Sequence, residues 1–111
     1  MEEYDDLSSG PDKDGIFNLS YNEWTIIPYD RCNVYSDRLL YLNLSHNNIV
    51  EISDKIASLT LLKEINLSHN ALRKIDRAMG KCIRLRKIDV SNNHLVSIPA
   101  EILSNCKMLV S

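Results

Sequence analysis

The chain has 111 residues, of which 44% are hydrophobic and 25% charged, and its formal net charge is −2. This length fits one domain, and the composition is that of a folded chain rather than of an intrinsically disordered one. No stretch approaches the roughly 20 apolar residues that span a bilayer. The N-terminus is acidic and polar, unlike a secretory signal or a basic transit peptide.

Charge and cysteine content describe the setting in which the chain works. Residues 1–30 carry eight acids and one base, a sum of −7, whereas residues 31–111 carry twelve bases and seven acids, a sum of +5. We interpret residues 1–13 as an acidic tail. Cys32, Cys82 and Cys106 are an odd number without metal-ligand spacing, so we expect reduced thiols in an intracellular, cytoplasmic protein. Cys82 and Cys106 are expected in the core, without a disulfide.

A pattern with a fixed period fills residues 14–111, and its first unit is irregular. In that unit, at about 14–38, Phe17, Leu19, Asn22, Trp24 and Ile27 occupy the slots, and Asp14 stands where a leucine is expected. Three regular units follow at 39–61, 62–84 and 85–108, in which Asn47, Asn70 and Asn93 are 23 residues apart. A fifth unit is expected to begin at Leu109, which makes the fourth unit one residue longer than its neighbours. A fixed period of this length predicts a solenoid.

Each regular unit predicts a strand, a turn and an outer wall, in that order. The units read leucine-x-x-aliphatic-x-aliphatic-x-x-Asn-x-aliphatic-x-x-Ile, filled by Leu39, Leu42, Leu44, Asn47, Ile49 and Ile52, by Leu62, Ile65, Leu67, Asn70, Leu72 and Ile75, and by Leu85, Ile88, Val90, Asn93, Leu95 and Ile98. The alternating aliphatic pair predicts a short strand with one buried face. The asparagine should be buried and should satisfy backbone groups at the turn. Ile56 and Leu59, Met79 and Cys82, and Ile102 and Cys106 should line the outer wall, where Ser53 or Asp54 caps a short helical turn.

These units resemble the leucine-rich-repeat superfamily across nearly the whole chain. The 23-residue period, the LNLSHN strands and the Ile-Pro pairs at 27–28 and 98–99 are most similar to intracellular repeats of the Ras group. Phosphatase-regulatory and axonemal dynein light-chain families are similar but have a 22-residue period. The resemblance implies an α/β solenoid with a parallel concave sheet and short helical or irregular convex turns. It also implies a protein partner without specifying which, since one scaffold serves many ligands. No C-terminal cap follows the last unit, so a partner or further repeats are expected to cover that end.

The resemblance places binding on the concave face, where the residues between the strand aliphatics should point. The most variable column there is Ile16, Tyr41, Glu64 and Lys87; the others are Asn18, Asn43, Asn66 and Asp89, a serine column, and Tyr21, His46, His69 and Asn92. The repeated asparagines and serines are typical of the scaffold itself, whereas Tyr41 beside charged neighbours resembles an interface hot spot, or else is a solvated tyrosine. The predicted partner-binding residues are Tyr41, Asn43, His46, Glu64, Asn66, His69, Lys87 and Asp89.

Other chemistries have weaker support in the sequence. Ser68, His69 and Asp89 contain the residue types of a hydrolytic triad, but Ser68 and His69 are neighbours that a strand would point to different sides. His46 and His69 lack a third ligand for a metal. We therefore expect no enzyme, no metal and no cofactor. A basic run across residues 63–87 favours a solvated surface, with an acidic partner segment, the acidic tail or RNA as alternatives.

The leading hypothesis is therefore a protein-interaction module that acts as adaptor, scaffold or assembly subunit. The alternatives are the regulatory domain of a larger enzyme, as in phosphatase or dynein complexes, and a basic RNA or membrane-surface adaptor.

Overall fold

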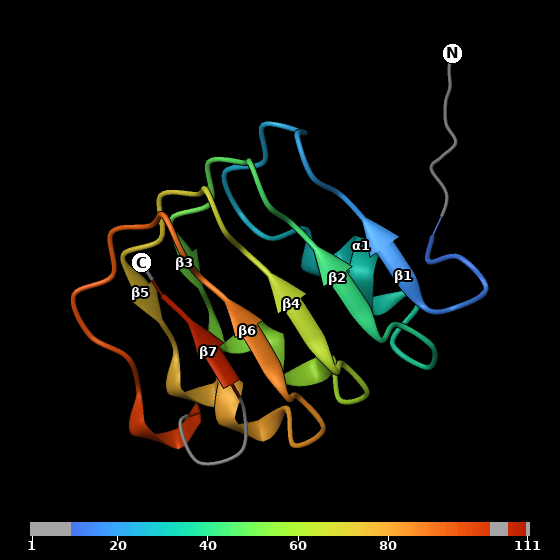
Figure 1. Ribbon diagram of the computed structural model, residues 1–111. Helices are drawn as coiled ribbons and strands as arrows, with labels where there is room; N and C mark the ends of the chain where they lie inside the picture. Colours follow the sequence, from blue (N-terminus) through green and yellow to red (C-terminus); the bar gives the residue numbers. More distant parts are fainter. Residues whose placement is uncertain (1–9, 103–106, 111) are drawn as a thin grey trace.

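The computed structural model describes residues 10–102 and 107–110, and these residues form a stack of coils with a sheet on one side. The sheet has five parallel strands in the order β1-β2-β4-β6-β7: β1 (Ile16–Asn18), β2 (Tyr41–Asn43), β4 (Glu64–Asn66), β6 (Lys87–Asp89) and β7 (Lys107–Leu109). The strands lie side by side along the stack (Figure 1), as the repeat period predicts.

Hydrogen bonds extend the strand pairing one residue beyond each strand. The second aliphatic of each pair donates its backbone N–H to the next coil: Leu19 to Asn43, Leu44 to Asn66, and Leu67 to Asp89, at 2.7–2.8 Å. The aliphatic-x-aliphatic pairs expected as strands therefore lie in the sheet. All of them are buried in the first four units, which confirms that one face of each short strand packs on the core.

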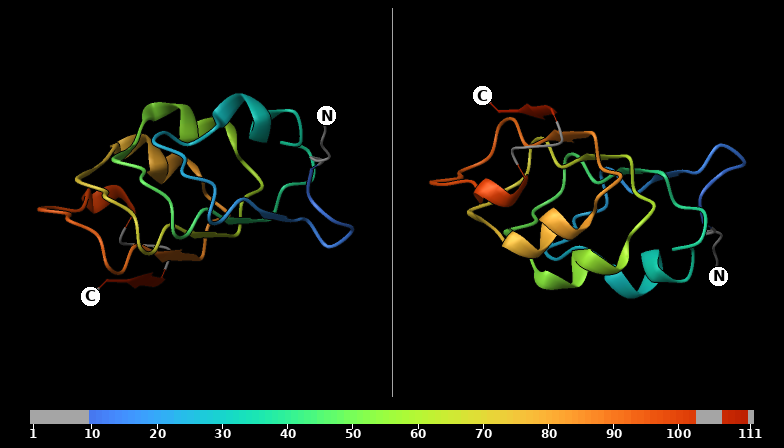
Figure 2. Two further views of the ribbon diagram at one scale, coloured as in Figure 1. Left: turned by 90° about the horizontal axis from the view of Figure 1, so that it is seen from above. Right: turned by 90° about the horizontal axis from the view of Figure 1, so that it is seen from below.

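Short helical turns form the side of each coil opposite to the sheet (Figure 2). They are α1 (Tyr29–Asn33) and the 3-10 turns η2 (Asp54–Ser58), η3 (Arg77–Lys81) and η4 (Ala100–Ile102). The hydroxyl of Ser53 accepts the Lys55 N–H at the start of η2, which confirms the expected cap. Asp76 caps η3 in the same way, through the Ala78 N–H.

A second, two-stranded sheet that the sequence did not predict lies between the first sheet and these turns. It pairs β3 (Glu51–Ile52) with β5 (Lys74–Ile75), with Ile52 opposite Ile75. Two residues are too few for alternation to indicate a strand, so the pattern identified the buried isoleucines but not their pairing.

The core is a continuous column of hydrophobic side chains, most of them aliphatic, from Phe17 to Ile102. The leucine, isoleucine and outer-wall slots of units two and three are buried, as are Leu85, Ile88 and Val90 of unit four. Leu95 and Ile98 are only half-buried, so the last regular unit covers its core less completely than the units before it.

Two cysteines extend this core, and both thiols are free. Cys82 is buried in the outer wall, as predicted, where its thiol lies 3.4 Å from the Ile56 carbonyl oxygen. Cys32, for which the irregular first unit gave no firm expectation, is also fully buried. Cys106 lies outside the described residues.

The buried asparagines bind the coils to one another. The amide group of Asn70 donates to the carbonyl oxygens of Leu44, Leu67 and Ser68, and its oxygen accepts the Ile49 N–H at 2.9 Å. Asn47 and Asn93 make equivalent bonds. The hydrogen-bonding role predicted for these asparagines is confirmed, although Asn93 is half-buried and Asn22, in the irregular first unit, is exposed.

The last strand departs from the expected repeat boundary. The paired residues advance by 23 positions from β2 to β4 and from β4 to β6, but by only 20 from Lys87 to Lys107. Leu109 therefore lies opposite Asp89, inside the fifth strand, and not at the start of a fifth unit. The reason is that this register places Met108 opposite Ile88, where its apolar side chain packs against the core.

Candidate functional site

The variable column crosses the exposed face of the sheet in one line. The strand register places Ile16 opposite Tyr41, Tyr41 opposite Glu64, and Glu64 opposite Lys87. Tyr41, Glu64 and Lys87 are half-buried and Ile16 is 43% exposed, so part of each side chain remains open to a partner. The predicted neighbourhood of these three site residues is therefore present in the structure.

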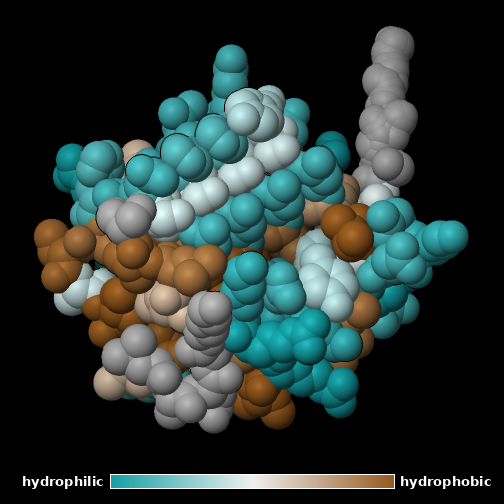
Figure 3. Space-filling model, in the orientation of Figure 1, coloured by the Kyte–Doolittle hydropathy of each residue, from teal (hydrophilic) through white to brown (hydrophobic). Residues whose placement is uncertain are grey.

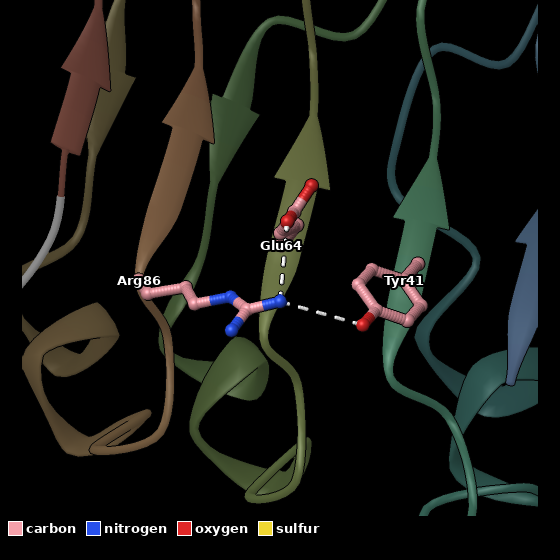
Figure 4. A network of polar contacts seen from close by, with 3 residues as sticks. All are labelled: Tyr41, Glu64 and Arg86. Carbon is pink, nitrogen blue, oxygen red and sulfur yellow. Dashed lines mark hydrogen bonds and ion pairs between the residues drawn. The ribbon is translucent and has the colours of Figure 1, made fainter.

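Arg86 joins this column, although the sequence assigned it only to the basic run. Its Nη2 atom lies 3.7 Å from Glu64 Oε2 and donates to the Tyr41 hydroxyl at 3.5 Å (Figure 4). Both contacts are long and the Arg86 side chain is largely exposed, so they orient these groups more than they stabilise the fold. The position of Arg86, one residue before β6, did not indicate that its side chain would reach across two strands to Tyr41.

The second column, Asn18, Asn43, Asn66 and Asp89, forms one repeated turn at the ends of the strands. In each case the side-chain Oδ1 accepts the N–H and the hydroxyl of the serine two residues later. Ser45 and Ser68 are buried by this arrangement, and so they do not face a partner as the alternation suggested. The serines are part of the scaffold.

The third column, Tyr21, His46, His69 and Asn92, contains a stack of rings at the border of the sheet face. Tyr21 stacks on His46 with 4.4 Å between ring centroids, and His46 stacks on His69 at 4.3 Å. Asn92 ends the series, with its Nδ2 3.3 Å from His69 Nε2. All four residues have φ between 56° and 58°. They lie in left-handed turns after the strands, and the alternation rule that placed them on the strands was wrong here because the chain has already turned.

The residues Asn43, Asn66 and Asp89 share a hollow with Tyr41, Glu64 and Lys87. Its volume is about 170 Å³, below the 300 Å³ or so at which small-molecule sites begin. In Figure 3, hydrophilic side chains form bands across this face of the sheet. The hollow is open and lined by both polar and apolar side chains, and its size suits side chains of a partner better than a whole cofactor.

The geometry also bears on the catalytic and metal hypotheses. The Ser68 hydroxyl donates to Asn66 at 2.7 Å, so its proton is directed to an amide oxygen and not to the ring of His69. Within residues 10–102 and 107–110, no three side chains of His, Cys, Asp or Glu come together as metal ligands would.

The basic run is divided between different sides of the molecule. Lys74 lies on β5 and Arg77 and Lys81 lie on η3, away from the sheet face, whereas Arg86 and Lys87 border the hollow. Of these five residues, Arg86 and Lys87 are placed to act together with the predicted site.

Comparison with known families gives two matches. A leucine rich repeat model matches residues 37–95, and a second Leucine Rich Repeat model matches residues 84–107. No curated protein matches the chain. In the described part of the chain, no helix is long and apolar enough to cross a membrane. The first match covers more than half of the 111 residues, and together with the observed coils it shows that this chain belongs to the leucine-rich repeat family.

Proposed function

We propose that this chain is a protein-interaction module, acting as an adaptor, scaffold or assembly subunit, that binds its partner on the concave face of the sheet. Repeats of this family are generally protein-interaction modules and are typically not enzymes. The observation that carries the proposal is the hollow over β2, β4 and β6, which brings together an aromatic ring, both signs of charge and open amides. Interface hot spots are enriched in aromatic residues and arginine, which Tyr41 and Arg86 supply here.

Tyr41 is the proposed anchor of the partner. Its ring lies at the hollow between apolar Ile16 and the charged pair Glu64 and Arg86. A half-buried tyrosine loses little conformational entropy on binding and offers both an apolar face and a hydroxyl. His46 and His69 border the same face and would contact a partner that extends past the ends of the strands.

The experiment is an affinity purification with the whole chain as bait, followed by titration of the partner that co-purifies. Tyr41→Ala should weaken that partner's binding by about 1–3 kcal/mol and leave the melting temperature almost unchanged. Ile83→Ala is the matched control, because Ile83 is 74% exposed and lies on the connection between η3 and β6, outside the hollow. Equal affinity of wild type and Tyr41→Ala would reject Tyr41 as the anchor of the partner.

We also propose an intracellular, cytoplasmic location. The support is the pair of free, buried thiols at Cys32 and Cys82, since chains in oxidising compartments usually form disulfides. Fractionation of cells that carry the tagged full-length protein tests this directly, and recovery from a secretory fraction would contradict it.

A further inference from the structure

The second column of the sheet face carries a row of amide donors with no partner in the described part of the chain. The Oδ1 atoms of Asn18, Asn43 and Asn66 accept bonds from serines, whereas no hydrogen bond is made there by their Nδ2 atoms. Asn18 is exposed, and the Nδ2 atoms of Asn43 and Asn66 are not buried. Each nitrogen can therefore donate to a molecule that lies on the sheet.

The direction of these amides is fixed by the backbone. The oxygen and nitrogen of an asparagine amide have nearly the same shape and can exchange places by rotation, but a backbone N–H can only donate. Because the Ser45 and Ser68 N–H groups donate to the Asn43 and Asn66 side chains at 3.0 and 2.9 Å, the atom facing each serine must be oxygen. The NH₂ groups therefore face away from the turn.

The fourth member of the row, Asp89, presents a hydrogen-bond acceptor where the other three present donors. Asp89 holds Ser91 as the asparagines hold their serines, at 3.1 Å to the N–H and 2.6 Å to the hydroxyl. Its second carboxylate oxygen is an acceptor where the other members present donors. Along the stack, the row therefore presents three donors followed by one negatively charged acceptor.

The spacing of the row selects one kind of partner backbone. Neighbouring strands lie about 4.8 Å apart, which places the four groups at about 0, 4.8, 9.6 and 14.4 Å. Residues on one face of an α-helix at i, i+3, i+7 and i+10 lie at about 0, 4.5, 10.5 and 15 Å along its axis. Side chains on one face of an extended strand recur about every 6.6–6.8 Å, so the second side chain no longer lies opposite the second donor of the row.

Resting on the proposed concave-face function, we propose that this row binds an α-helix of the partner that lies across the strands. The helix carries Asp or Glu at i, i+3 and i+7, opposite Asn18, Asn43 and Asn66, and Lys or Arg at i+10, opposite Asp89. Arg86 and Lys87 border the same hollow and favour an acidic helix face. The opposite chain order, with the base first, fits equally because the spacings are nearly symmetric.

The test uses synthetic 18-residue helical peptides, held by side-chain lactams, whose binding to the whole chain is followed by fluorescence anisotropy. Two peptides carry the pattern in either chain order, a third has the same composition in scrambled order, and a fourth carries the acidic residues on an extended, proline-containing backbone. We expect one patterned helix to bind at least tenfold more tightly than the scrambled and extended peptides. Equal binding of the scrambled peptide would show attraction by charge alone and would overturn the proposal, as would equal binding of the extended one.

Variants of the row separate donor recognition from folding. Asn43→Asp and Asn66→Asp remove the donor but keep the oxygen that holds the serine, and Asp89 shows that an aspartate supports this turn. Each should weaken the patterned helix about tenfold or more, while Asn48→Asp, an exposed control with the same change in charge, should have little effect. Asp89→Asn should shift the preference from Lys to Glu at i+10.

The same variants distinguish this inference from the proposed function. If Tyr41→Ala weakens the co-purified partner but Asn66→Asp does not, the concave face binds without the donor row and this inference is wrong. If neither variant affects that partner, the concave-face function itself is wrong. Loss of the patterned helix in Asn66→Asp, with wild-type melting temperature, supports both.

Discussion

Single residues show most clearly which parts of this molecule the sequence could predict. The asparagines at the strand ends were predictable because a polar side chain at a buried, repeated position must satisfy backbone groups. The unpaired Nδ2 donors of Asn18, Asn43 and Asn66 could not be predicted. An asparagine that only holds the turn and one that also offers a donor to a partner look identical in the sequence. Arg86 was missed for a related reason, since the reach of a long side chain depends on the curvature of neighbouring strands.

The buried amide of Asn70 leads to a stability prediction. Asn70→Ala removes three donated bonds and one accepted bond, and it leaves the carbonyls of Leu44, Leu67 and Ser68 without this partner. The free energy of unfolding should fall by about 1–3 kcal/mol. Urea denaturation measures it, with Asn48→Ala as an exposed control. An unchanged unfolding midpoint for Asn70→Ala would contradict the structural role.

The two buried thiols give a prediction about pH. Burial raises the pKa of Cys32 from 9.0 to about 12 and that of Cys82 to about 11, because the thiolate loses its hydration. The native state therefore favours the protonated thiols more strongly than the unfolded state does. This contribution to stability is complete below pH 9 and is lost as pH rises toward 11–12. Burial raises the pKa of Tyr29 as well, in the same direction.

Unfolding experiments between pH 8 and 11 measure this loss, and the double variant Cys32→Ala, Cys82→Ala should show a shallower decline. A bulky thiol reagent provides an independent measurement at pH 8, where Cys32 and Cys82 of the native protein should react far more slowly than in urea. Rapid native labelling at both positions would contradict their burial.

At the scale of the elements, the period predicted the order of strands and turns, but local packing determined their ends. The order of strand and turn followed from slots that bury hydrophobic side chains, most completely in units two and three. The third column was misplaced because its residues adopt left-handed turns, which neither histidine nor tyrosine makes predictable. The fifth strand was shifted because Met108, rather than Leu109, packs over the core.

The units differ in how completely their core residues are buried, and this predicts differences in local stability along the chain. Units two and three have coils on both sides, whereas in unit four Leu95 and Ile98 are half-buried and Val96 is 90% exposed. Stability in a solenoid is close to a sum of repeat and neighbour terms. Amide exchange should therefore be slowest in β2 and β4 and fastest after Ile98. Uniform protection through Leu109 in a monomer would show that this end is covered.

At the scale of the whole molecule, the coils convert a linear repeat into a surface whose rows differ in chemistry. The scaffold residues recur in every unit, so the sequence identified the fold from them and could not identify a partner. We propose that information about the partner lies in the positions that change between units, such as Tyr41, Glu64 and Lys87. The five strands give this surface a length of about 19 Å, which is the length of roughly 13 helical residues.

Lys87 is expected to influence how quickly a partner arrives more than how long it stays. Its side chain is half-buried at the border of the hollow, and Arg86 adds a second positive charge nearby. Lys87→Glu should reduce the association rate of the co-purified partner severalfold and flatten its dependence on salt, whereas the dissociation rate changes less. Stopped-flow measurements at low and high salt separate the two rates. Lys81→Glu, the same charge reversal on the exposed η3 turn, is the control. Equal effects of the two variants would show that net charge alone attracts the partner, and an effect of Lys87→Glu confined to dissociation would place its ammonium group in a direct bond with the partner.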